Sequence, residues 1–381
     1  MTAMNIISWI LWALLFIPVA YLTLFAILSL AAKRYRYPAG RRTDSFVVLI
    51  PAYKSDSTIL QTAQSALGQD YTAGKFRVLV ISDSMRADTV EALRQAGAEV
   101  LEVSFENSTK AKSLNAAMEH LGPHAADRIV ILDADNIVGE SFLSLLDDAF
   151  CDGVRAVQAH RCAANRDTDV AVLDAASEEI NNSVFRKGHC AAGLSSALIG
   201  SGMAFEYSWF AQACKSLVTS GEDKELELRL LSDGIFIEYL DYVKVRDEKT
   251  RTGGNYYNQH RRWTASQYNI LPAALRGFKD AKDKKGYADK LLQWMFPSRM
   301  MLTGLIPVLA AAASILGLSN ARTWWELFVM LAVAMLLALP QEHLDAKLWK
   351  SLIKAPLLAA MAVANLFRMK GTKDKFIHTE H

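Results

Sequence analysis

The sequence lacks the marks of several common protein classes. Its four cysteines form no CxxC pair and have no zinc-ligand spacing with histidine, so they are predicted to be buried, reduced thiols. The 42 basic and 40 acidic residues leave a net charge of only +2, which gives no large basic surface for nucleic acid. Neither internal repeats nor low-complexity tracts occur. These absences favour a globular or membrane-associated protein of about two domains.

Charge is absent from one long stretch near the start. Residues 5–32 contain no charged side chain, and the run exceeds the roughly 20 residues that a helix needs to cross a bilayer. A signal peptide would have a shorter apolar core of about 7–15 residues behind a basic segment. We therefore expect a retained membrane span. Basic residues follow within 33–42, and the positive-inside rule then predicts that the next domain is cytoplasmic.

The last third of the chain contains three further apolar stretches. Residues 300–318 and 324–340 are predicted to form a pair of spans. Residues 351–369 have basic residues on both flanks, which is typical of a helix lying in the membrane interface. A third span there would export the basic tail, against the charge rule.

Between residues 44 and 250 short apolar runs alternate with helical patterns. Buried strands are predicted at 46–53, 76–83, 98–103 and 128–135, and helices near 57–68, 86–96 and 110–121. Such an alternation predicts an α/β sheet of parallel strands with helices on both faces.

Acidic residues stand at the ends of two of these strands. Asp83 ends one strand, and Asp133 and Asp135 end another. In open α/β sheets ligands bind beyond the carboxyl ends of the strands, and alternate residues of an extended chain point to the same face. Two adjacent carboxylates suit a hard divalent ion, Mg²⁺ or Mn²⁺, that is shared with substrate phosphate oxygens.

Two predicted helix starts also carry reactive side chains. Lys110 begins one helix, where an ammonium group and backbone N–H groups suit a diphosphate. Glu222 and Asp223 begin another, where acidic residues stabilise the first turn, and Asp223 in a cleft would be able to take a proton from a hydroxyl. Gly200 and Gly202 allow either a close approach of backbone to a sugar or an ordinary turn.

The hexapeptide NQHRRW at 258–263 combines cations with a large aromatic side chain. It has three interpretations: a lipid-headgroup patch, a nucleic-acid patch, or a wall of a site for a phosphate-bearing substrate. Arginine offers a planar fork for phosphate, and tryptophan offers an apolar face for a sugar ring. Nucleic acid would require a broader basic surface than this chain has.

Together these motifs resemble the membrane-integrated family 2 glycosyltransferases, which include cellulose, hyaluronan and poly-N-acetylglucosamine synthases and ceramide glucosyltransferase. The family pattern is an aspartate after the second strand, a DxD, an ED pair and QxxRW. The matching residues here are Asp83, Asp133-Ala134-Asp135, Glu222-Asp223 and Gln259-His260-Arg261-Arg262-Trp263. The resemblance covers about residues 45–270 and the general layout of membrane segments.

The resemblance implies an α/β GT-A (Rossmann-like) cytoplasmic domain with flanking transmembrane and interface helices, a UDP-sugar donor, Mg²⁺ or Mn²⁺, and inversion at the anomeric carbon. Asp223 would be the general base. The implied donor-binding residues are Pro51, Tyr53, Asp83, Lys110, Asp133 and Asp135, with Asp133 and Asp135 also at the metal. The implied acceptor and diphosphate residues are Glu222, Gln259, Arg262 and Trp263. The segment from Pro51 to Asp56, PAYKSD, lacks the glutamate usual in the family.

The expected organisation follows from these motifs. Residues 1–43 form a transmembrane helix and basic linker, 44–254 the GT-A domain, 255–298 the QxxRW and interface helices, and 299–381 the C-terminal membrane helices and cytoplasmic tail. We expect an integral protein of a bacterial-type inner or plasma membrane. The expected acceptor is a growing β-linked polysaccharide, and a lipid receiving a single sugar is the alternative.

Further expectations concern partners and the tail. We expect membrane lipid as a partner and no nucleic acid. A homo-oligomer or a separate export partner is also possible. The tail Phe376-Ile377-His378-Thr379 is similar to the F-x-V-T of the cellulose synthase gating loop. An inactive scaffold would have lost at least one acidic site residue, and all four motif aspartates are present.

Overall fold

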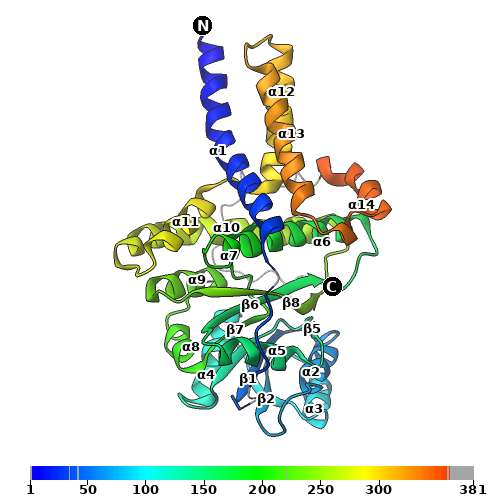
Figure 1. Cartoon of the computed structure of the whole chain (residues 1–381). Helices are drawn as coiled ribbons and strands as arrows, with labels where there is room; N and C mark the ends of the chain where they lie inside the picture. The colour runs from blue at the N-terminus through cyan, green and yellow to red at the C-terminus, as the bar shows by residue number, and fades with distance from the viewer. Residues whose placement is uncertain (1, 34, 41–42, 220, 358–359, 361–381) are drawn as a thin grey trace.

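The computed structural model describes residues 2–33, 35–40, 43–219, 221–357 and 360. An α/β domain lies at one end, a layer of helices crosses the middle, and three long apolar helices project from the other side (Figure 1). The functional residues predicted from the sequence lie between the sheet and the middle layer.

The α/β domain is built on an eight-stranded sheet in the order β3-β2-β1-β4-β7-β6-β8-β5. The strands are β1 (Phe46–Tyr53), β2 (Phe76–Asp83), β3 (Glu99–Val103), β4 (Arg128–Ile131), β5 (Ile137–Val138), β6 (Ala156–Ala163), β7 (Met203–Glu206) and β8 (Ile237–Asp247). The first four in the order are mutually parallel, as predicted. In the other half β7 runs antiparallel to both neighbours, and β5 runs antiparallel to β8. The sheet is therefore mixed.

Helices cover both faces of the sheet because β1 is apolar at every position of its first five residues. Val48 and Ile50 pack in the core beneath α2 (Ile59–Leu67), α3 (Ala87–Gln95) and α5 (Phe142–Cys151). Val47 and Leu49 face the opposite core, beneath α4 (Lys110–Leu121), α8 (Tyr207–Cys214) and α9 (Glu222–Asp233). The period of two along a strand sends alternate side chains into the two cores. The predicted α/β fold class is confirmed.

The predicted extent of one strand is wrong. β4 ends at Ile131, so Asp133 and Asp135 lie in a turn and not at alternate positions of an extended strand. The cause is Asn136, whose side-chain oxygen accepts a hydrogen bond from the Asp133 N–H at 3.0 Å. Its own N–H donates to the Asp133 carbonyl at 3.1 Å. Asparagine side chains of this kind replace strand hydrogen bonds with a local turn.

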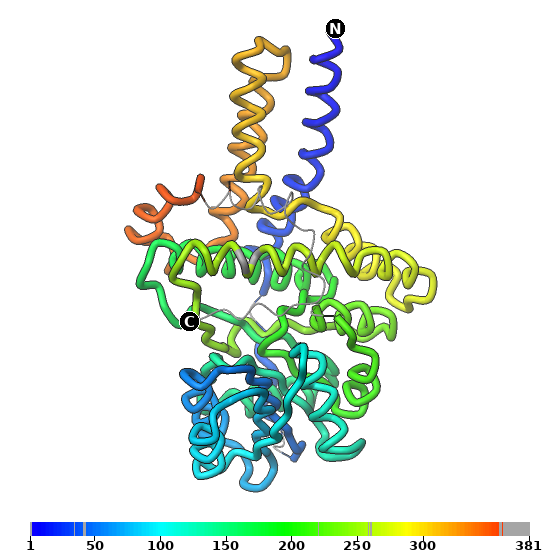
Figure 2. Tube along the Cα trace, turned by 180° about the vertical axis from the view of Figure 1, so that it is seen from behind, coloured from blue at the N-terminus to red at the C-terminus, as the bar shows by residue number. Residues whose placement is uncertain are grey.

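The middle layer consists of α6 (Asp169–Asn181), a π-helical segment (Asn182–Gly188), α7 (His189–Ala191), α10 (Gly253–Gly277) and α11 (Lys284–Met295). Figure 2 shows α10 crossing almost the full width of the molecule between the sheet and the projecting helices. The lower part of α1 packs on the π-helical segment and on α7. This layer therefore joins the membrane-like part of the chain to the α/β domain.

Two helices, α1 (Ala3–Ala31) and α13 (Ala321–Ala338), are long and apolar enough to cross a membrane. A third would result if α11 and α12 (Arg299–Ile315), which meet at an angle of 51°, form one bent span. Trp324 donates to the Ser8 hydroxyl at 3.0 Å, and Ser8 donates to Asn320 at 2.8 Å. Buried polar links of this kind hold helices together in lipid.

The structure describes only part of the C-terminal segment for which predictions were made. A short helix, α14 (Ala346–Ser351), follows α13 and packs on α6. Most of the predicted interfacial helix at 351–369 and the whole of the Phe376–Thr379 motif lie outside the described residues.

Candidate active site

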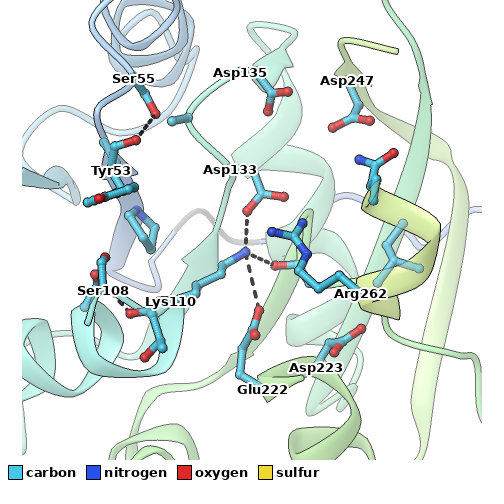
Figure 3. Close-up of a pocket in the computed structure, with 18 of the residues that line it drawn as sticks. Tyr53, Ser55, Ser108, Lys110, Asp133, Asp135, Glu222, Asp223, Asp247 and Arg262 are labelled. Atoms are coloured by element: carbon cyan, nitrogen blue, oxygen red, sulfur yellow. Dashed lines mark hydrogen bonds and ion pairs between the residues drawn. The ribbon is translucent and has the colours of Figure 1, made fainter. Parts of the chain in front are cut away.

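A cavity of about 850 Å³ opens at the carboxyl ends of β1 and β4. Every residue that the sequence analysis assigned to the site lines this cavity except Asp83. Figure 3 shows side chains from α4, α9, α10 and the loop after β4 pointing into one space. The cavity is also lined by residues that no sequence motif indicated, among them Ser108, Thr109, Arg161, Lys224, Asp247 and Glu248.

Lys110 occupies the centre of the cavity (Figure 3). Thr109 caps α4, so the chain places Lys110 at the first helical position. The Lys110 ammonium donates to the Asp133 carboxylate, donates to the Gly200 carbonyl at 2.6 Å and lies 3.7 Å from Glu222. Burial lowers the pKa of Lys110, but the neighbouring Asp133 and Glu222 carboxylates outweigh it and raise that pKa above its usual value. The lysine is therefore held as a cation where the acidic residues meet.

Asn136 organises the DxD turn and joins it to a third carboxylate. It is fully buried, and its amide nitrogen donates to Asp135 at 3.2 Å and to Asp247 at 3.1 Å. Burial, followed by the proximity of Asp247 and Asp133, raises the pKa of Asp135 well above its usual value. The ionised form of Asp135 is therefore disfavoured where these carboxylates meet. Asp247 carries no clear signal in the sequence, because the strand that it ends is interrupted by charged residues at 238, 241, 244 and 246.

Glu222 and Asp223 form the first turn of α9, where the helix dipole stabilises negative charge. Burial raises the pKa of Glu222 to about 7, with Lys110 opposing and Asp223 reinforcing the shift. Asp223 is partly buried and has Lys224 at 3.7 Å. Its carboxylate faces the cavity near Arg262 (Figure 3).

The QxxRW motif lies on α10. Gln259, Arg262 and Trp263 are spaced by three and four residues, so they share one face of the helix, and this face lines the cavity. Burial lowers the pKa of Arg262, and nearby Glu222 and Asp133 oppose that shift. The Gln259 side-chain oxygen is buried and has no hydrogen-bond partner among the described residues.

Asp83 lies beside the cavity and not in its wall. It is the last residue of β2, pairs in register with Tyr53 of β1 and is fully buried. The Ser84 hydroxyl donates to one of its carboxylate oxygens at 2.9 Å. The other oxygen has no hydrogen-bond partner within the described part of the chain. An unsatisfied buried acceptor of this kind is typical of a ligand contact.

Gly200 and Gly202 both adopt a positive φ, 86° and 63°. A side chain at Gly202 would approach Val245 to 3.0 Å, so the loop needs glycine there for packing as well as for conformation. This places the Gly200 carbonyl against Lys110. The loop thus contributes backbone to the cavity wall.

A second group of buried charges, which includes the cavity-lining residues Arg161 and Asp247, was not predicted. Glu178 of α6 accepts from Arg161 at 2.8 Å and from Arg186 at 3.2 Å. Lys249 lies 2.8 Å from Asp247 and 3.6 Å from Glu178. Burial would raise the pKa of Glu178, but these cations overcome it and hold that pKa below its usual range. Every charge in this group has an opposite partner.

The donor set of the DxD region fits a hard divalent cation. Among the described residues, no three histidine, cysteine, aspartate or glutamate side chains are already arranged around a metal position. Asp133 and Asp135 nevertheless supply oxygen ligands, and burial with the nearby Asp247 and Asp133 raises the pKa of Asp135. Oxygen donors grouped in this way suit Mg²⁺ or Mn²⁺ bound together with substrate oxygens.

Comparison with solved structures confirms the fold. The chain superposes on a mannosyltransferase from Pyrobaculum calidifontis, solved in complex with GDP-Man and Mn²⁺, with a TM-score of 0.60 and 17% identity over 94% of this chain and 99% of that one. Glucosyl-3-phosphoglycerate synthase from Mycobacterium tuberculosis matches with a TM-score of 0.43 and 16% identity over 59% of this chain and 77% of that one.

Sequence comparison gives the family. An N-acetylglucosaminyltransferase from Rhizobium leguminosarum bv. viciae is 25% identical over 287 residues, which cover 68% of this chain and 67% of the relative. The family model "Glycosyltransferase like family 2" matches residues 43–266, which is more than half of the chain and includes Asp83, the DxD, the Glu222–Asp223 pair and QxxRW. The chain therefore belongs to the glycosyltransferase family 2-like proteins, and it is a glycosyltransferase with a GT-A fold.

Proposed function

We propose that this glycosyltransferase moves a sugar from a UDP-sugar to an acceptor hydroxyl at the membrane surface, with inversion at the anomeric carbon. One observation carries the proposal. A single cavity is lined by the DxD turn, Lys110, the Glu222–Asp223 turn and the QxxRW face. Together they supply carboxylates for a metal ion, cationic side chains for a diphosphate, and one carboxylate suited to accept a proton.

The donor half of the cavity is assigned to the side nearest β1 and β4. Asp133 and Asp135 would hold Mg²⁺ or Mn²⁺, which when bound offsets the charge of the diphosphate and of the leaving group. Lys110 and Arg262 face the same space and would bind diphosphate oxygens. The unpaired buried oxygen of Asp83 supports a contact to a base N–H.

Further contacts complete the donor half. Pro51 and Tyr53 line the cavity at the end of β1 and would flank the nucleoside. In the Pyrobaculum protein the same fold holds GDP-Man and Mn²⁺. That agrees with a nucleotide sugar and a divalent ion in this fold.

The acceptor half contains the groups for the chemical step. Asp223 takes the proton of the acceptor hydroxyl while the acceptor oxygen bonds to the anomeric carbon. The bond from that carbon to the phosphate oxygen breaks in the same step, and the diphosphate leaves with the electron pair. One base and one in-line displacement invert the anomeric centre without a covalent intermediate. Trp263 offers a face for the acceptor, and Glu222 and Gln259 offer polar contacts beside it.

Placement in the membrane belongs to the same proposal. We assign α1 and the pair α12–α13 as membrane spans, and we place the GT-A domain on the cytoplasmic side because basic residues follow α1. We also propose the domain boundaries expected from the sequence, with segments at 1–43, 44–254, 255–298 and 299–381. Both a growing polysaccharide and a membrane lipid are compatible with QxxRW. The acceptor decides between a polymer synthase and a glycolipid transferase.

The test is nucleoside diphosphate release from purified protein in detergent, over a panel of UDP-sugars with Mg²⁺ or Mn²⁺, followed by sizing of the products. We expect one UDP-sugar to support release, and chelator to abolish it. A long polymer would identify a polysaccharide synthase, and a single-sugar lipid a glycolipid transferase. Full activity in excess chelator would remove Asp133 and Asp135 from a metal role.

A further inference from the structure

A second cavity, of about 280 Å³, adjoins the first on its membrane side. The two cavities share the wall residues Arg161, Ile199, Asp223, Lys224 and Trp263. Asp223 and Trp263, to which we assign proton transfer and acceptor binding, therefore lie at the junction of the two spaces. A molecule in the second cavity would reach the proposed base directly.

The outer wall of the second cavity is made by the apolar helices. Pro18, Tyr21 and Leu22 contribute the middle of α1. The opposite wall includes the break at 296–298, where α11 and α12 bend by 51° (Figure 2). Above this level the large side chains of α1 point outward and are exposed, as in a lipid-facing helix. The cavity thus lies where the apolar helices enter the middle layer.

Arg299, the first residue of α12, differs from the other cations of this cavity. Arg161 and Arg186 are neutralised by Glu178, and Lys224 lies beside Asp223. Arg299 is partly buried and donates only to neutral oxygens, the Ser177 carbonyl at 2.9 Å, the Ser177 hydroxyl at 3.1 Å and Asn181 at 2.8 Å. Within the described residues no carboxylate lies within ion-pair distance of Arg299, so its charge has no direct counter-ion.

We propose that the second cavity binds the headgroup of a membrane lipid that carries a phosphate, and that Arg299 binds this phosphate while the headgroup hydroxyl reaches Asp223. The inference rests on the proposed function and names its acceptor class. A guanidinium without a counter-ion, in a cavity walled on one side by a membrane helix, is matched by an anionic amphiphile. The alkyl chains would lie against α1 and α12.

The size of the cavity favours a headgroup over a polymer. Ligand pockets for small molecules occupy about 300–1,000 Å³, and this cavity of about 280 Å³ lies just below that range. Among the described helices α1, α12 and α13 pack directly on one another, α1 with α13 and α12 with α13. Tyr21 of α1 packs against Phe296 at the bend and donates to Asp289 of α11 at 2.7 Å. A lipid acceptor needs these contacts to part only far enough for a headgroup, whereas a polymer needs a passage through the bundle.

The test is photo-cross-linking in a polyoxyethylene detergent, which needs neither donor nor turnover. The probes are phosphatidylglycerol and diacylglycerol that carry the same diazirine chain, because both have a free hydroxyl and only the first has a phosphate. We expect phosphatidylglycerol to label peptides containing Leu22 or Met300. Arg299→Gln should weaken this labelling about tenfold, because one charge-assisted contact is lost, and Arg299→Lys should retain much of it.

The matched control is Arg322→Gln. Arg322 lies in the first turn of α13, where it is exposed and paired with Glu326. This substitution should leave labelling unchanged. Equal labelling by both lipids, or labelling unaffected by Arg299→Gln in a variant that elutes as folded protein, would overturn the phosphate assignment. Displacement by soluble glycerol phosphate as effectively as by phosphatidylglycerol would show that the cavity takes a soluble anion.

A second readout separates this inference from the proposed function. Lipid-stimulated nucleoside diphosphate release should fall about tenfold in Arg299→Gln, because the phosphate contact is lost, while Arg322→Gln should keep the wild-type stimulation. If wild type releases no nucleotide at all but the lipid selectivity holds, the proposed function fails and the lipid site stands.

Discussion

Two groups of buried charges lie side by side in this protein and differ in one respect. Around Glu178 each carboxylate has cationic partners, and the pKa of Glu178 is held low. In the 850 Å³ cavity, burial and like charges raise the pKa of Asp135 and bring that of Glu222 to about 7. In the first group opposite charges are paired, and in the second burial and like charges disfavour ionisation of the carboxyl groups. Perturbed carboxylates of the second kind are typical of functional sites.

The largest expected effect on stability comes from the balanced group. Glu178→Gln is nearly isosteric but leaves Arg161 and Arg186 buried without their carboxylate. Breaking a buried pair in this way costs about 3–5 kcal/mol, so the denaturation midpoint should fall strongly. Circular dichroism against temperature in detergent measures it. A midpoint equal to that of wild type would show that the network does not stabilise the fold.

A matched change in the 850 Å³ cavity, Asp135→Asn, should affect turnover and leave stability intact. Asp135→Asn removes a carboxylate that Asp247 and Asp133 repel, so the thermal midpoint should stay the same or rise. Turnover should fall by about 100-fold or more, because the metal contributes several kcal/mol to the transition state. Activity and thermal midpoint are measured on the same preparation. A destabilised Asp135→Asn protein with normal turnover would reverse the roles of the two groups.

Trp263 tests the boundary between the donor and acceptor halves. Removing the indole face by Trp263→Ala should raise the acceptor KM about tenfold, as expected for losing part of a buried aromatic contact. Donor affinity should be unchanged, and titration with the nucleoside diphosphate checks this. An equal loss of both affinities would place Trp263 at the nucleotide.

The smallest expected effect is a pH dependence from Glu222. Its pKa is about 7 in the folded chain against 4.5 for an ordinary glutamate. Between these values the folded protein holds a proton that the unfolded chain has released, so Glu222 makes stability fall as pH rises from about 4.5 to 7. Glu222→Gln should lack this contribution. We expect the loss in thermal midpoint between pH 5 and pH 8 to be smaller in the variant.

Much of the fold could be predicted from the sequence, because it is encoded in local patterns. The strands at 46–53 and 76–83 and the helix at 110–121 have the predicted bounds, since each is a continuous apolar run or a capped amphipathic helix. β7 and β8 were missed because their antiparallel or bulged pairing depends on partners distant in the chain. The strand around Asp133 was drawn too long because Asn136 replaces strand hydrogen bonds with a turn.

The candidate site was predictable to the extent that motifs carry it. Asp133, Lys110, Asp223 and Arg262 come from four segments, yet they line one cavity as expected. Asp247 and Asn136 were missed, because their importance arises from contacts across the sheet. Arg299 was missed for the same reason: only the fold shows that Glu178 pairs with Arg161 and Arg186, whereas no described carboxylate lies within ion-pair distance of Arg299.

The central claim is that the cleft transfers sugar with Asp223 as the base, and nucleoside diphosphate release by Asp223→Asn tests it most directly. With the donor, metal and acceptor that support wild-type activity, the account predicts a loss of about 10²–10⁴-fold in turnover, which is the usual contribution of a general base. Binding of the nucleoside diphosphate should be unchanged. Wild-type turnover in Asp223→Asn would contradict the account.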